Sequence, residues 1–168
     1  MKINFTKPFR DVYEIFLHHS ATDNPDHDTL DWIYDVHVNQ NGWSDVGYHF
    51  FIDSEGGLHE GRDLERQPAA QSGHNKHTIA ICLSGIGDSF SKKQLKTLKK
   101  LCKKINKEYS GKVKFKGHKE VNSTECPHFD YKALLRLDDL GYMKKSRASK
   151  IIKSLIGFAF SFGISKFK

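Results

Sequence analysis

The chain has 168 residues, which suits one domain with a substantial hydrophobic core. Its 27 Lys and Arg residues exceed its 20 Asp and Glu residues, giving a formal net charge of +7. Seven basic residues and no acidic residue lie in 144–168, so residues 1–143 are formally neutral. A neutral body argues against a broad phosphate-binding face, and we therefore expect no nucleic-acid partner.

The N-terminus and the cysteines bear on where the protein is made. Residues 1–16 have scattered charge and a proline where a secretory signal needs a continuous apolar stretch, so we expect no signal peptide. The three cysteines, Cys82, Cys102 and Cys126, cannot all pair, and their spacing matches no disulfide framework. Both features favour synthesis in the reducing cytoplasm.

The apolar pattern predicts strands and helices in alternating order. Strands are expected at 11–19, 46–53, 78–85 and 112–118, with a turn and a short strand within 54–63. Helices are expected at 28–40, 91–109 and 130–140. Asp28 is the expected N-cap of the first helix, and Ser91 and Gln94 form a capping box at the start of the second. We expect a single α/β domain, 1–143, with a central mixed sheet flanked by helices.

The cysteines differ in their surroundings. Cys82 lies in a strand apolar enough to be buried on both faces, and Cys102 lies on the apolar face of a helix, so both are expected in the core. Cys126 instead lies in the polar loop "GHKEVNSTECPHFD", eight residues after His118. This loop has too many Gly, Asn, Ser and Pro residues for a continuous helix.

Two histidines end the first strand. Because neighbouring strand residues point to opposite faces, only one of His18 and His19 can face a given site. Together with His118 and Cys126, that histidine would suit a catalytic zinc ion, whose fourth position holds water. Spacing alone slightly favours the alternative, a loop cysteine that binds no metal. A cysteine nucleophile paired with His118 is a further alternative.

Five segments occur together in order across residues 10–142: "FLHHSAT", "GWSDVGYHFFID", "GLHEGRD", "TIAICLSG" and "GHKEVNSTECPHFD". In order and spacing they resemble the type 2, zinc-dependent N-acetylmuramoyl-L-alanine amidases, especially small bacteriophage endolysins, and the related peptidoglycan recognition proteins. The resemblance implies the fold of that family, Zn²⁺ as cofactor and bacterial peptidoglycan as substrate. It also implies an endolysin made in the host cytoplasm that acts on the cell wall in the periplasm, and we expect a monomer.

The resemblance also implies roles for five residues. His18, His118 and Cys126 match the zinc ligands of the family. Tyr48, in "GYHF", matches a tyrosine that assists catalysis. Thr124 occupies a position where some phage enzymes carry a lysine, and its neutral hydroxyl supplies no positive charge to an oxyanion. Zinc would then carry more of that stabilisation.

One departure concerns the cleft. Ala70 stands where many relatives carry a histidine before the pattern that His74 and Asn75 continue. We therefore expect that a substrate-contacting residue of the cleft is either missing or replaced by His74 or His77.

Other mechanisms are less consistent with these residues. A glycosidase needs a pair of carboxylates, and Glu60 and Asp63 are better interpreted as surface or structural residues. A cysteine nucleophile would leave His18 and Tyr48 without roles. A peptidoglycan-binding module without activity is the main alternative, although non-hydrolytic relatives commonly lack the cysteine that Cys126 matches.

The segment 144–168 is unnecessary for an amidase domain. Within 150–165 lies an apolar stretch of about a dozen residues, short of the roughly 20 that span a bilayer. Its phenylalanines and flanking lysines predict a cationic amphipathic helix that contacts membrane or lipopolysaccharide. The alternatives are a last helix packed on the domain, or a protein that kills mainly through this segment.

Overall fold

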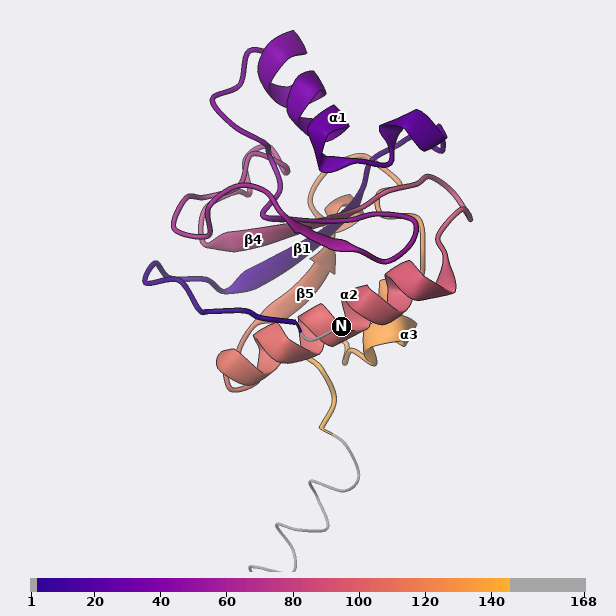
Figure 1. The fold of residues 1–168 in the computed structure, drawn as a ribbon. Coiled ribbons are helices and arrows are strands. Elements are labelled where there is room, and N and C mark those ends of the chain that lie inside the picture. Colours follow the sequence, from indigo (N-terminus) through magenta and orange to yellow (C-terminus); the bar gives the residue numbers. More distant parts are fainter. Residues whose placement is uncertain (1–2, 146–168) are drawn as a thin grey trace, which may run out of the picture.

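A five-stranded mixed sheet forms the centre of the protein in this computed structural model, which describes residues 3–145 (Figure 1). The predicted helix within 150–165 lies outside the described residues. The strands, in the order in which they lie in the sheet, are β3 (Leu58–Glu60), β2 (Phe50–Ile52), β4 (Thr78–Leu83), β1 (Glu14–His19) and β5 (Lys114–Gly117). Strand β1 is parallel to β4 and β5, β2 is parallel to β4, and β3 is antiparallel to β2. The predicted mixed sheet is confirmed.

Helices cover both faces of the sheet. Figure 1 shows α1 (Leu30–Tyr34) on one side, and α2 (Lys92–Glu108) and α3 (Tyr131–Leu135) on the other. The side chains of β2 alternate accordingly: Phe50 and Ile52 join the core under α2, and Phe51 joins the smaller core that includes Ile33 of α1. Every residue of β4 is buried, as its continuous apolar run predicts.

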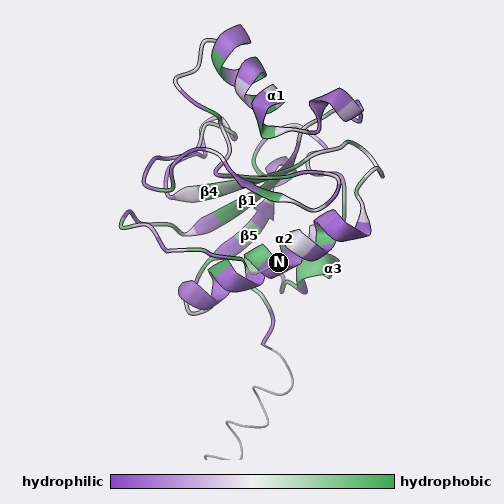
Figure 2. Ribbon diagram, in the orientation of Figure 1, coloured by the Kyte–Doolittle hydropathy of each residue, from purple (hydrophilic) through white to green (hydrophobic). Residues whose placement is uncertain are grey.

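Helix α2 begins at the predicted capping box, in which Ser91 and Gln94 exchange hydrogen bonds. Its buried face includes Leu98, Leu101 and Cys102, so Cys102 lies in the core as predicted. Figure 2 shows green and purple alternating along α2, as expected for a helix with one buried face. The described residues include no helix long and apolar enough to cross a bilayer.

The first helical region begins later than predicted and changes helix type before it ends at Gln40, the predicted last residue. Thr29, not Asp28, is the N-cap, since its hydroxyl accepts a hydrogen bond from the Trp32 backbone. The Asp28 carboxylate instead accepts from the Ser54 backbone. A 3₁₀ turn, η1 (Pro25–His27), precedes α1, and after α1 the chain continues as a π-helical segment, η2 (Asp35–Gln40).

The other predicted elements are shortened. Strand β1 begins at Glu14 rather than 11, and β2 covers only the end of the predicted strand 46–53. The strand predicted at 112–118 ends at Gly117, and His118 begins the 3₁₀ turn η3 (His118–Glu120). Helix α3 stops early because Arg136 adopts a left-handed conformation, with φ 56°, which cannot continue a right-handed helix.

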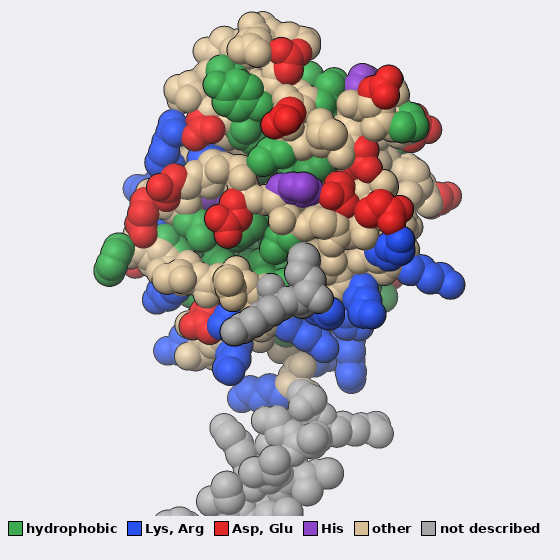
Figure 3. All heavy atoms as spheres, viewed as in Figure 1, with side chains coloured by type: hydrophobic (Ala, Val, Ile, Leu, Met, Phe, Trp, Pro, Cys, Tyr) green, Lys and Arg blue, Asp and Glu red, His purple; other side chains and the backbone are tan. Residues whose placement is uncertain are grey.

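Charge is separated within the formally neutral body. Helix α2 carries eight lysines and one glutamate. Figure 3 shows Lys and Arg side chains gathered over α2, whereas most Asp and Glu side chains of this face lie on the half that includes α1. A neutral total therefore coexists with a basic surface, a local feature that net charge does not reveal.

Candidate metal and catalytic site

Three side chains with ligand atoms meet at the C-terminal end of β1. These are His18, His118 and Cys126, whose ligand atoms all lie within 4.8 Å of one another. The sheet brings the histidines together, because β1 and β5 are parallel neighbours with Leu17 opposite Gly117. The ring centroids of His18 and His118 are 4.7 Å apart, and Cys126 Sγ is 3.8 Å from His18 Nδ1.

The loop that carries Cys126 is fixed by backbone contacts. The Cys126 carbonyl accepts from Lys119 N at 2.8 Å, and the Cys126 N–H donates to Thr124 Oγ1 at 3.2 Å. Gly117 permits the close approach of this loop. A Cβ at Gly117 would lie 2.7 Å from a ring carbon of Tyr131 and 2.8 Å from Pro127 Cδ.

The donor set fits zinc. With bond lengths of about 2.3 Å to sulfur and about 2.0 Å to nitrogen, a tetrahedral site separates these atoms by roughly 3.5 Å. The observed separation of Cys126 Sγ and His18 Nδ1, 3.8 Å, is close to that value. Two imidazoles and one thiolate leave one of four positions for water or substrate, which is the pattern of a catalytic zinc site.

Burial sets the protonation of two of these groups. Burial is the main cause that lowers the pKa of His18 to about 3; the neighbouring His118 ring also lowers this pKa, and the hydrogen bond with Gln71 opposes the shift. His18 is therefore neutral at pH 7 and keeps a lone pair for a ligand. Burial also raises the pKa of Cys126 to about 11, so a metal would have to displace the thiol proton.

The two adjacent histidines face opposite sides, as the strand pattern predicts. His18 faces Cys126 and His118, whereas His19 packs near the rings of Phe90 and His128. The His19 Nδ1 atom accepts a hydrogen bond from Ala21 N. Its backbone N–H still contributes to the site, since it donates to Cys126 Sγ at 3.4 Å.

Tyr48 and Thr124 both lie next to the ligand residues. The Tyr48 ring centroid is 5.3 Å from that of His18, and burial raises the pKa of the Tyr48 phenol well above its usual value. The phenol therefore stays protonated at neutral pH and can donate a hydrogen bond. Thr124 Oγ1 accepts from Cys126 N, which leaves the hydroxyl proton available for another acceptor.

Gln71, which sequence reasoning missed, contacts one of the candidate ligand residues. Its side chain is fully buried, and its Oε1 lies 3.0 Å from His18 Nε2. The substrate contact predicted for His74 or His77 stays a prediction: the His74 side chain is exposed, and His77 Nδ1 lies 3.3 Å from the Asp11 carbonyl, with its ring against Tyr13. No sequence signal distinguishes this glutamine from others in polar loops.

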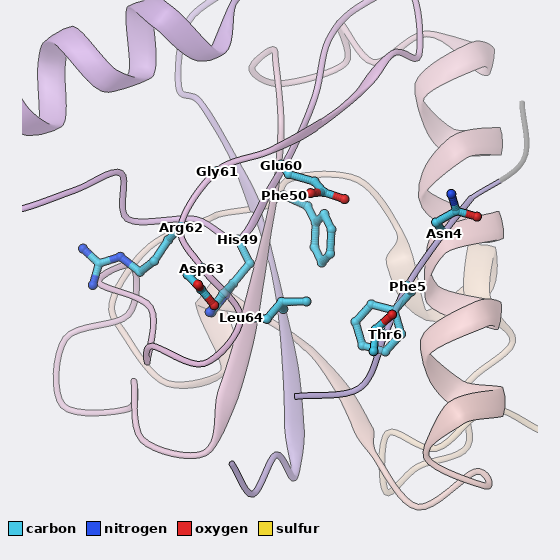
Figure 4. Close-up of a pocket in the computed structure, with 10 residues that line it drawn as sticks. All are labelled: Asn4, Phe5, Thr6, His49, Phe50, Glu60, Gly61, Arg62, Asp63 and Leu64. Atoms are coloured by element: carbon cyan, nitrogen blue, oxygen red, sulfur yellow. The ribbon is translucent and has the colours of Figure 1, made fainter. Parts of the chain in front are cut away.

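A separate cavity lies between the N-terminal segment and the β2–β3 hairpin (Figure 4). It includes Glu60 and Asp63 but none of the three ligand residues. The two carboxylates lie on different sides of Phe50 in Figure 4, and Asp63 accepts from Glu65 N in a turn. These contacts agree with the structural interpretation of Asp63 and give no support to a glycosidase site.

Comparison with known proteins gives consistent matches. Residues 8–129 match the family model described as N-acetylmuramoyl-L-alanine amidase. The endolysin of Enterobacteria phage T3 is 35% identical over 138 residues, covering 78% of this chain and 89% of the relative. The structure of N-acetylmuramoyl-L-alanine amidase LysC from Clostridium intestinale URNW is 26% identical with a TM-score of 0.67, covering 80% of this chain and 93% of that one. Peptidoglycan-recognition protein SC1a of Drosophila melanogaster is 29% identical over 103 residues, covering 58% of this chain and 55% of the relative.

Proposed function

Because the chain belongs to the N-acetylmuramoyl-L-alanine amidase family, we propose that it is a zinc-dependent endolysin. It hydrolyses the amide bond between N-acetylmuramic acid and L-alanine in bacterial peptidoglycan. The observation that carries this proposal is the convergence of His18, His118 and Cys126, with ligand atoms within 4.8 Å. The phage endolysins among its relatives support host cell lysis as the biological outcome.

The chemistry divides between the ion and the protein. Zinc held at this site would supply a nucleophile at neutral pH and polarise the scissile carbonyl. In this proposal His18, His118 and Cys126 hold the ion, and the protonated Tyr48 phenol donates a hydrogen bond to the negative charge that develops on the carbonyl oxygen. The Thr124 hydroxyl adds a second, neutral donor.

The proposal also covers where the protein is made, where it acts and what its C-terminal segment contacts. The protein is made in the host cytoplasm, acts as a monomer, and reaches peptidoglycan in the periplasm. In addition, residues 144–168 contact membrane or lipopolysaccharide. Their seven basic residues and the eight lysines of α2 give the chain two basic regions suited to an anionic surface.

The main test is a digest of isolated peptidoglycan, with and without a chelator, analysed by mass spectrometry. Free stem peptides that begin with L-alanine, lost on chelation and restored by zinc, are the expected products. Cys126→Ser should release none, whereas Asp139→Asn, which changes an exposed side chain outside the site, should match the wild type. Tight binding of intact wall without products would mean a recognition module instead.

A truncation tests the C-terminal proposal separately. Removing 146–168 keeps the hydrogen bond from Lys144 N to the Arg136 carbonyl, so the described fold retains this contact. The truncated protein should hydrolyse purified wall at the wild-type rate and act more weakly on whole cells. Equal loss in both assays would contradict membrane or lipopolysaccharide contact, and killing that persists under chelation would favour a mainly membrane-active protein.

A further inference from the structure

A side-chain amide oxygen lies beside the Nε2 atom of each candidate ligand histidine. His18 Nε2 is 3.0 Å from Gln71 Oε1, and His118 Nε2 is 3.1 Å from Asn122 Oδ1. We propose that Gln71 and Asn122 are positioning residues that hold both histidines as Nδ1 ligands, with Gln71 the more important of the two. The inference rests on the proposed metal site and deepens it.

The direction of the Gln71 hydrogen bonds follows from its neighbours. The Thr78 hydroxyl donates to the Asn75 carbonyl at 2.8 Å, so its oxygen accepts from Gln71 Nε2 at 2.7 Å. Gln71 Nε2 also donates to the His74 carbonyl at 3.3 Å. The amide oxygen must therefore face His18, where it can only accept.

This direction fixes the tautomer of His18. Because Gln71 Oε1 accepts, His18 carries its proton on Nε2 and its lone pair on Nδ1. Nδ1 is also the atom that lies 3.8 Å from Cys126 Sγ. The hydrogen-bond network thus selects the nitrogen that faces the other ligands, as outer partners of metal-binding histidines generally do.

Burial makes Gln71 difficult to replace. Its side chain is fully buried, and Asn75 Oδ1 accepts from the backbone N–H groups of both Ala70 and Gln71 at 3.1 Å. Water has little access to take over its hydrogen bond to His18. Asn122 is partly exposed, so water can substitute for its amide.

Zinc affinity tests the proposal without any activity assay. Competition with a chromophoric chelator should show zinc binding that is about 10- to 100-fold weaker in Gln71→Met, which keeps the length but removes the acceptor. Asn122→Ala should have a smaller effect. Gln71→Glu keeps an acceptor for His18 Nε2–H but, like Gln71→Met, loses the donor to Thr78 Oγ1 and the His74 carbonyl, so it should bind zinc more tightly than Gln71→Met.

The tautomer provides a second measurement that needs no variant. Nitrogen-15 NMR of the metal-free wild type at neutral pH should show His18 protonated at Nε2. Protonation at Nδ1, or Gln71→Met binding zinc within threefold of wild type, would overturn the proposal. If wild type bound no zinc at all, the proposed function would fail, whereas the His18 tautomer would still report on Gln71.

Discussion

His49 should make the stability of the protein depend on pH. It is buried beside β4, where its Nδ1 accepts from Ala80 N at 3.0 Å and its Nε2 donates to the Arg66 carbonyl at 2.9 Å. Protonation of Nδ1 is unfavourable because the added proton would point at the Ala80 N–H. The positive charge would also lie close to the Arg10 guanidinium, which is 3.2 Å from Nε2. The pKa of His49 is lowered to about 4, mainly by burial. The hydrogen bond to the Arg66 carbonyl raises this pKa, whereas the positive charges of Arg10 and Arg62 lower it.

The sign and size follow from that pKa. The unfolded chain takes up the His49 proton near pH 6.5, whereas the folded protein resists it until about pH 4. The contribution to stability is therefore complete above pH 6.5 and is lost as the pH falls toward 4. Between pH 7.5 and 4.5 this linkage removes about 2.5 kcal/mol from the free energy of unfolding.

Urea unfolding at both pH values measures this loss. The experiment compares wild type with His49→Gln, with chelator present so that metal binding does not contribute. The decrease in unfolding free energy between pH 7.5 and 4.5 should be about 2.5 kcal/mol smaller in the variant. A matched His74→Gln variant changes an exposed side chain and should retain the wild-type decrease. Equal decreases in wild type and His49→Gln would refute the reasoning.

Three further substitutions test the site. Tyr48→Phe should reduce kcat/KM about 100-fold while zinc affinity stays within twofold, because it removes one donor to the developing charge; an unchanged rate would exclude this role. Thr124→Ala should lower the free energy of unfolding by about 1 kcal/mol, because it removes the hydrogen bond from Cys126 N, and it should also lower kcat/KM. Thr124→Ser keeps the hydroxyl and should preserve both values. Equal behaviour of the two variants in thermal unfolding and kinetics would contradict this role. Gly117→Ala should lower the free energy of unfolding by about 1–3 kcal/mol and weaken zinc binding, because its Cβ would clash with Tyr131 and Pro127. A wild-type melting temperature and zinc affinity would show that the loop moves to accommodate the methyl group.

The parts of the fold predicted correctly depend on local patterns. The capping box at Ser91 and the apolar run of β4 are readable over a few residues, and both are present in the structure. The opposite directions of His18 and His19 follow from the period of a strand. The family motifs then selected Cys126, which spacing alone left ambiguous.

The parts that were wrong or missed depend on contacts between distant segments. Asp28 lost the capping role to Thr29 because its carboxylate bonds Ser54, which is 26 residues away. Gln71 is 53 residues from His18 in the sequence, and the two side chains are brought into contact only by the folded position of the loop that carries Gln71. A short-range pattern contains no information about either contact.

The place of β1 in the sheet has a consequence for biosynthesis. It leaves the ribosome before the other strands of this sheet, yet it lies between β4 and β5, which are made much later. Until those strands emerge, its apolar residues, such as Phe16 and Leu17, have no partners on either edge and are exposed to other nascent chains. Slower synthesis at lower temperature, or a chaperone that covers this segment, should therefore raise the yield of folded protein.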